Sequence, residues 1–179
     1  MSYTNADKLQ LLMLCDIYKK LDIQGGFNPD VISTAISTGN LWAIDAEYSM
    51  VIGEEISKEV RDNVVGALNC YRYISASIAK LPTADKDELV AEFKLKIHDK
   101  HVQFPGYDGN SEGEYSSVAR MFGVLGKFAE QVEIDKNSHE ENRDAYSEMS
   151  LYVRDVVDRL ALSKMQLKEL LSLAPIFWD

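Results

Sequence analysis

The residues best suited to chemistry gather in one loop, where the run Phe104-Pro105-Gly106-Tyr107-Asp108 precedes Glu112. Part of this loop matches the first half of a calcium-binding loop at its first, third, fifth and sixth positions, which are Asp108, Asn110, Glu112 and Gly113. The twelfth position of a calcium loop must be a bidentate acid, and here it is Ala119. We therefore predict a capped turn rather than a calcium site.

Two interpretations of the loop stay open. Loops carry binding residues more often than helices do, which favours a small-ligand site formed by Phe104, Tyr107, Asp108 and Glu112. In the alternative the loop is an ordered turn, in which Phe104 and Tyr107 plug the core. Asp108 would then accept a hydrogen bond from the backbone two residues further on. The two interpretations differ in what Asp108 faces, a ligand or its own turn.

Two further pairs have the spacing of chemical sites but lack the context. His98 and His101 could share a metal with a third ligand, yet no HExxH pattern or nearby cysteine supports them. Ser77 and Lys80 match the serine–lysine spacing of acyl enzymes, but they end a long predicted helix, whose dipole there opposes an alkoxide. We predict no metal and no cofactor. The sequence identifies no catalytic residue and leaves open whether the protein is an enzyme.

The charge distribution argues against nucleic acid as a partner. The 179-residue chain has 29 acidic and 19 basic residues, and no Lys or Arg occurs between Lys20 and Lys58. Two predicted helices that meet at Gly39 have the spacing of a helix-turn-helix, but their acidic side chains would be repelled by phosphate. The acidic interval from Asp22 to Glu55 is either a docking face for a basic protein or, as we favour, a solvated surface.

Cysteine usage and hydropathy indicate a cytoplasmic protein. Cys15 and Cys70 lie in apolar helical stretches, where buried free thiols in a reducing compartment are expected. The N-terminus lacks the basic and apolar regions of a signal peptide. The longest unbroken apolar run is Leu11 to Cys15, whereas a membrane span needs about 20 residues. We therefore expect no membrane association.

The placement of proline predicts a helical fold. All four prolines lie at the boundaries of amphipathic stretches, and proline inside a helix costs about 3 kcal/mol. The pattern predicts an all-α protein, a single irregular multi-helix domain of about eight helices over residues 1–179. Five helices are expected at 5–21, 29–38, 41–52, 57–81 and 85–100. The first is apolar nearly all round, so we expect it to be the buried centre of the domain.

The last three predicted helices share a start signal, a serine followed three residues later by Glu or Gln. The pairs are Ser111–Glu114, Ser138–Glu141 and Ser163–Gln166. The final helix is expected to end at Leu173. After Pro175, Ile176 to Trp178 are unusually apolar for a chain end, and we expect them to dock on their own subunit or on a neighbour.

Two of the predicted helices carry apolar residues at heptad spacing. The first seam is Val60, Val64, Ala67, Tyr71, Ile74, Ile78 and Leu81. The second is Tyr146, Met149, Val153, Val156 and Leu160. The spacing leaves open whether each seam packs inside one chain or joins two chains.

Several segments together resemble the YfbU-like proteins of bacteria. They are Thr4 to Ala6, Ile36 to Gly39, Glu54 to Val60, Tyr71-Arg72 with Ile74 and Ser77, Phe104 to Asp108 with Glu112 and Tyr115, and Leu162-Ser163. The resemblance implies a soluble, all-helical bacterial protein and carries over no catalytic residue. We expect a non-enzymatic binding or interaction protein that forms a homo-oligomer. The alternative is an enzyme or small-ligand binder with its site at the Phe104–Asp108 loop.

Overall fold

The computed structural model describes residues 3–48 and 55–175, and within these ranges the fold is mostly helical, with eight helices and one short hairpin. The chain forms two compact units, residues 1–55 and 56–179. The first contains α1 (Asn5–Lys20), α2 (Pro29–Thr38) and α3 (Trp42–Tyr48). The second contains α4 (Lys58–Ile78), α5 (Thr83–Glu92), β1 (Ile97–His98), β2 (His101–Val102), α6 (Gly113–Val124), α7 (Arg143–Arg154) and α8 (Lys164–Leu173). The small hairpin makes the protein mostly α rather than all α.

Local signals set the helices of the N-terminal unit. The Thr4 side chain and Asp7 form a capping box at the start of α1. Asn28 caps α2, Pro29 is its first residue, and Gly39 ends it in the left-handed conformation, as the sequence predicts. The core of this unit is small, because its buried apolar cluster is Ala35, Ile44 and Tyr48.

The predicted role of the first helix needs correction. Although α1 is apolar nearly all round, Cys15 is its one residue that is buried in the structure. α1 packs on α2 in the small N-terminal unit rather than at the centre of the larger one. A helix can bury only the side that has a neighbour, so its remaining apolar side chains stay at the surface.

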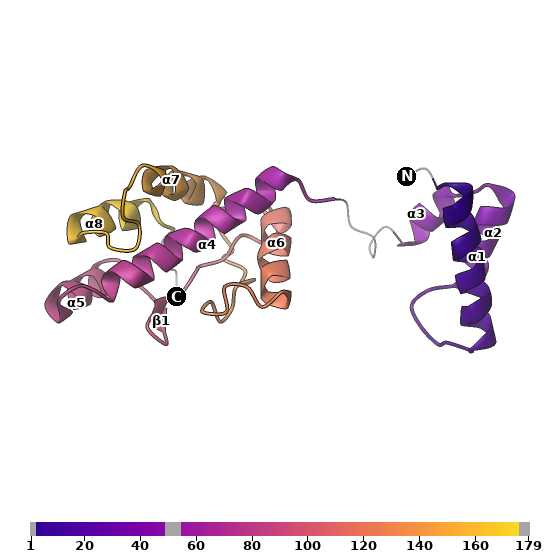
Figure 1. The fold of residues 1–179 in the computed structure, drawn as a ribbon, viewed down its shortest axis with the longest axis horizontal. Coiled ribbons are helices and arrows are strands. Elements are labelled where there is room, and N and C mark those ends of the chain that lie inside the picture. Colours follow the sequence, from indigo (N-terminus) through magenta and orange to yellow (C-terminus); the bar gives the residue numbers. More distant parts are fainter. Residues whose placement is uncertain (1–2, 49–54, 176–179) are drawn as a thin grey trace. The chain divides into compact units, whose positions relative to one another are not determined.

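The C-terminal unit is built around α4. Figure 1 shows α4 running the length of this unit, with α7 on one side of it and α6 on the other. The hairpin strand β2 also packs on α4, and α8 packs on α7. One continuous apolar cluster fills this unit, and α4 supplies the largest share of it: Val60, Val64, Ala67, Leu68, Cys70, Tyr71, Ile74 and Ile78.

Most residues of both heptad seams are buried within one chain. α4 and α7 pack on each other, and Val64, Ile74 and Met149 are fully buried. The rings of Tyr71 and Tyr146 meet edge to face, with centroids 6.1 Å apart. These buried residues therefore form the core of the C-terminal unit, whereas Leu160 of the second seam lies beyond the end of α7 and is 53% exposed.

The fifth predicted helix is too long. α5 ends at Glu92 with Phe93 as its C-cap, and the hairpin β1–β2 follows where the sequence predicts further helical turns. Asp99 and Lys100 have φ angles of +44° and +72°, which is the left-handed geometry of a tight hairpin turn. His98 and His101 consequently pair across the hairpin instead of lying on a helix face.

One of the three predicted capping boxes is confirmed. Ser163 and Gln166 cap α8 reciprocally. The other two predictions are wrong, because α6 begins at Gly113 and α7 at Arg143, each later than its serine predicts. The Ser111 hydroxyl donates to Asp108 instead, and the Ser138 hydroxyl donates to the Glu140 carbonyl. α7 also ends at Arg154, before the predicted Leu160.

Two predictions fall partly or wholly outside the described residues. The predicted helix 41–52 is described as far as Tyr48, and the tail Ile176 to Trp178 lies outside the described ranges. Docking of this tail stays a prediction, as does the assignment of residues 1–179 to a single domain.

Candidate functional site

The Phe104–Asp108 loop enters the core of the C-terminal unit. Phe104 and Tyr107 are buried, with exposed fractions of 3% and 1%. The Phe104 ring lies 5.5 Å from Tyr71 and 5.0 Å from Tyr146, measured between centroids. This arrangement matches the interpretation of the loop as an ordered turn that plugs the core.

Gly106 makes this entry possible. Its φ of +95° disfavours any side chain, and an added Cβ would lie 1.9 Å from the Lys136 carbonyl oxygen. The Gly106 carbonyl accepts hydrogen bonds from the Tyr146 hydroxyl at 2.9 Å and from the Asn142 side-chain amide at 3.1 Å. The loop backbone is therefore fixed by both steric and polar contacts.

Asp108 is a turn-former. Its carboxylate accepts from the Ser111 hydroxyl at 2.6 Å and from the Asn110 backbone N–H at 3.1 Å. The Ser111 hydrogen bond is the main cause that holds the pKa of the Asp108 carboxyl below its usual value. The carboxylate is thus engaged by its own turn.

Glu112 performs a structural task that the sequence does not reveal. Its carboxylate is 4% exposed and accepts from three backbone N–H groups. Oε1 accepts from Asn142 at 2.9 Å and from Arg143 at 2.6 Å, while Oε2 accepts from Asp108 at 3.0 Å. Glu112 therefore caps the N-terminus of α7 from 30 residues away along the chain.

The four predicted ligand residues, Phe104, Tyr107, Asp108 and Glu112, do lie together, but each is engaged by the protein itself. A ligand-binding role for them stays a prediction. Ser77 is also buried, and its hydroxyl accepts from the Leu162 backbone N–H at 2.9 Å. Among the described residues, no group of three or more His, Cys, Asp or Glu side chains is placed to hold a metal ion.

Both cysteines are free and buried, as predicted. Burial raises the pKa of the Cys70 thiol to about 11, although a contact with the Ser150 hydroxyl works in the opposite direction. The thiol therefore stays protonated near neutral pH and is a poor nucleophile.

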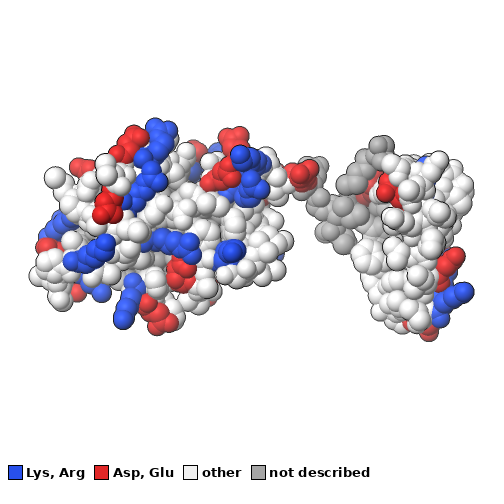
Figure 2. Space-filling model, in the orientation of Figure 1, with Lys and Arg blue, Asp and Glu red and all other residues white. Residues whose placement is uncertain are grey.

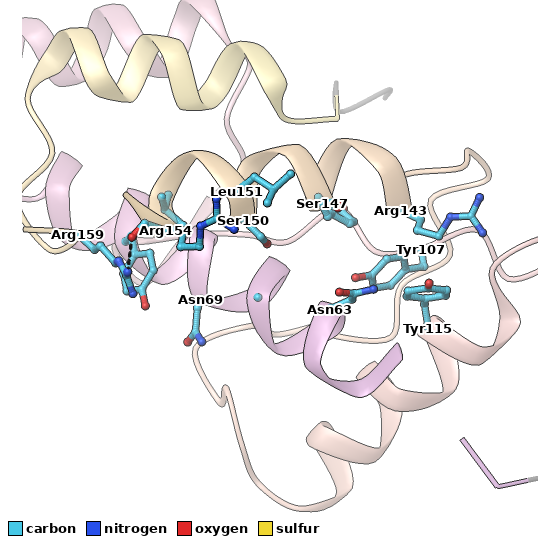
Figure 3. A pocket seen from close by; sticks show the side chains of 14 residues that line it. Asn63, Asn69, Tyr107, Tyr115, Arg143, Ser147, Ser150, Leu151, Arg154 and Arg159 are labelled. Carbon is cyan, nitrogen blue, oxygen red and sulfur yellow. Dashed lines mark hydrogen bonds between the residues drawn. The ribbon is translucent and has the colours of Figure 1, made fainter. Parts of the chain in front are cut away.

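A groove between α4 and α7 lies beside the loop and has a volume of about 350 Å³ (Figure 3). We call it the α4–α7 groove. Its lining residues are Asn63, Gly66, Asn69, Tyr73, Tyr107, Tyr115, Arg143, Tyr146, Ser147, Ser150, Leu151, Val153, Arg154 and Arg159. Tyr107 thus links the predicted loop site to a surface cavity. Sequence analysis missed the groove because its two walls lie about 80 residues apart, as the Cys70–Ser150 contact illustrates.

The two ends of the α4–α7 groove differ. Figure 3 shows Arg154 and Arg159 at one end, and Arg143, Tyr107 and Tyr115 at the other. The rings of Tyr107 and Tyr115 lie 5.2 Å apart between centroids, so they form an aromatic wall at their end. The Arg159 guanidinium donates to the Arg154 carbonyl at 2.7 Å and so provides a hydrogen-bond partner for a backbone carbonyl at the C-terminal end of α7.

A second surface feature lies on the N-terminal unit. The outward side of α1 carries Leu9, Met13, Leu14, Ile17 and Leu21, which are 50% to 67% exposed. We call these five residues the α1 face. An apolar cavity of about 460 Å³ adjoins it, and Leu14 and Ile17 line this cavity together with Phe27. Figure 2 shows few charged side chains on the visible side of this unit.

The fold and these two features define a mostly helical protein with a basic groove on one unit and an apolar helix face on the other. The YfbU domain family matches residues 1–172, so the chain belongs to that family. Comparison with curated proteins finds no match, and comparison with solved structures finds none. No helix in the described ranges is both long enough and apolar enough to cross a membrane.

Proposed function

We propose that the chain is a soluble, cytoplasmic interaction protein of bacteria that acts without catalysis and self-associates through the α1 face. The observation that carries this proposal is the exposure of the α1 face, where Leu9, Leu14 and Leu21 are 60%, 59% and 67% exposed. Single exposed apolar residues need no explanation, but a contiguous apolar helix face indicates an interaction surface. The small core of the N-terminal unit adds to the argument, because units of this size rarely bury enough apolar surface alone.

The area of the patch suits an interface between two copies. Fully burying one such side chain contributes about 1.5–3 kcal/mol, which at about 25 cal/mol per Å² corresponds to roughly 60–120 Å² of apolar surface. The α1 face together with Ile23 and Phe27, which are 44% and 48% exposed, therefore holds on the order of 350 Å² of apolar surface. A standard interface buries about 800 Å² per partner, of which about 450 Å² is apolar. The patch supplies most of that apolar share.

The charges of α1 favour an antiparallel pair. Asp7 lies in its first turn and Lys20 in its last turn, where the neighbouring Lys19 is already paired with Asp30. An antiparallel second copy places Asp7 of one helix near Lys20 of the other and also opposes the two helix dipoles favourably. A two-fold axis near Met13, in the middle of α1, would use the same face on both copies.

We expect Met13→Glu to convert a dimer into a folded monomer. Met13 is 58% exposed, so the added charge would cost little within one chain and much within an apolar interface. Sedimentation velocity should give twice the chain mass for the parent and a single chain mass for the variant. The matched control is Val157→Glu, because Val157 is fully exposed on the C-terminal unit, and it should remain dimeric. A parent chain that sediments as a monomer, or a dimeric Met13→Glu variant, would contradict the proposal.

A second candidate function is binding of a small ligand, with or without catalysis, near the Phe104–Asp108 loop. The observation in its favour is that Tyr107 of this loop lines the α4–α7 groove. A basic protein is an additional candidate partner, and the observation in its favour is the net acidic interval from Asp22 to Glu55.

A further inference from the structure

The α4–α7 groove differs in charge from the rest of the chain. The protein has 29 acidic residues against 19 basic ones. None of the described residues that line the groove is acidic, whereas Arg143, Arg154 and Arg159 all line it. Amide and hydroxyl groups of Asn63, Asn69, Ser147 and Ser150 complete a lining rich in hydrogen-bond donors.

The two arginines at one end keep donors available. Arg159 uses one N–H group on the Arg154 carbonyl, and Arg154 pairs through Nε with the exposed Asp155 at 3.4 Å. A guanidinium carries five N–H donors, so most of those on Arg154 and Arg159 are uncommitted. Solvent-exposed ion pairs such as Arg154–Asp155 are weak, and both side chains are more than two-thirds exposed. A ligand anion can therefore compete for Arg154.

The opposite end offers a flat apolar surface. The half-buried Tyr115 faces the groove there, beside Arg143 (Figure 3), and its ring is backed by that of the buried Tyr107. Aromatic rings favour stacking or edge contacts with another planar group. The volume of about 350 Å³ lies at the lower end of the range for small-molecule sites, so the groove suits a small ligand.

We propose that the α4–α7 groove binds a small organic anion, with its carboxylate or phosphate against Arg154 and Arg159 and a planar body extending toward Tyr115. Planar donor geometry makes arginine the usual partner for both of these anionic groups. The groove belongs to the C-terminal unit and the α1 face to the N-terminal one, so substitutions in each test the two proposals separately.

The test uses the full-length protein and simple probes. We would titrate it with 1-naphthyl phosphate and 1-naphthoate by isothermal calorimetry, with inorganic phosphate and 1-naphthol as the two halves of the first probe. We expect saturable binding of at least one naphthyl anion, at least about tenfold tighter than either half, because charge and ring contacts act together. Stronger binding of the phosphate or of the carboxylate then identifies the anionic group.

Variants assign the binding to the groove. Arg154→Gln and Arg159→Gln should each weaken the better naphthyl anion about tenfold, the loss expected for a charge-assisted hydrogen bond. Arg154→Gln is the safer variant, since it leaves the Arg159 bond to the Arg154 carbonyl in place. The matched control is Arg120→Gln, because Arg120 pairs with Asp135 and does not line the groove. This variant should bind the naphthyl anion with the affinity of the parent protein. Absence of saturable binding by both naphthyl anions, or equal affinity in the parent and Arg154→Gln, would overturn the proposal.

Discussion

Replacing Ile74 by Asp should leave the C-terminal unit unfolded. Ile74 is fully buried in the C-terminal part of α4, and its surroundings are the apolar core of this unit. An unpaired carboxylate in such a place costs on the order of 5 kcal/mol or more, which is comparable with the whole stability of a domain. Val153→Asp on α7 should act in the same way, because Val153 is buried in the same cluster.

Circular dichroism and the dispersion of NMR signals would show this loss directly. The matched control is Ile74→Val, which removes one methylene and should cost about 0.5–1.5 kcal/mol while the fold is retained. The opposite outcome has a specific meaning. A soluble, folded Ile74→Asp chain of lower mass than the parent would place the α4 seam between chains and contradict the internal packing of α4 on α7.

Replacing Glu112 by Ala should destabilise the protein more than replacing Asp108, the other charged residue of the predicted ligand site. Three backbone N–H groups lose their acceptor, and the N-terminus of α7 loses its cap. Buried donors without a partner cost about 1–3 kcal/mol each, so we expect a loss of about 3–5 kcal/mol in the free energy of unfolding. At roughly 2–4 °C per kcal/mol, the melting temperature should fall by about 6–20 °C.

Thermal unfolding followed by circular dichroism would measure this effect. Asp108→Asn is the control in the same loop, because its amide oxygen can still accept from the Asn110 N–H and its amide NH2 can donate to the Ser111 hydroxyl, which turns to accept and so preserves the turn. Its melting temperature should stay close to that of the parent. If Glu112→Ala melts like the parent, the carboxylate does not cap α7 and becomes available again as a ligand-facing acid.

The parts of the fold that could be predicted are those with local signals. Asn28, Pro29 and Gly39 define α2 within a few residues of chain, and the same is true of Ser163 and Gln166 for α8. The serines at 111 and 138 have the same pattern but do not cap helices. Glu112 explains the second case, because it binds the backbone N–H groups of Asn142 and Arg143 and so sets the start of α7 from a distant segment.

The candidate sites depend on which surfaces meet, and spacing does not determine that. The hydrophobicity of α1 is evident from the sequence, but whether it is buried depends on its neighbours. The α4–α7 groove likewise combines Asn69 of one helix with Arg154 of another. In contrast, the burial of Phe104 and Tyr107 follows from their size and from Gly106, and it matches one of the two interpretations of the loop.

The central claim is that two copies pair through the α1 face, and disulfide cross-linking of Met13→Cys tests it most directly. A two-fold axis near Met13 brings the two new thiols close enough to bond, while the native Cys15 and Cys70 are buried. Val157→Cys provides a fully exposed thiol outside the interface. Under mild oxidation, the account predicts rapid formation of a covalent dimer by Met13→Cys and slow formation by Val157→Cys on a non-reducing gel. Equal rates for the two variants would contradict it.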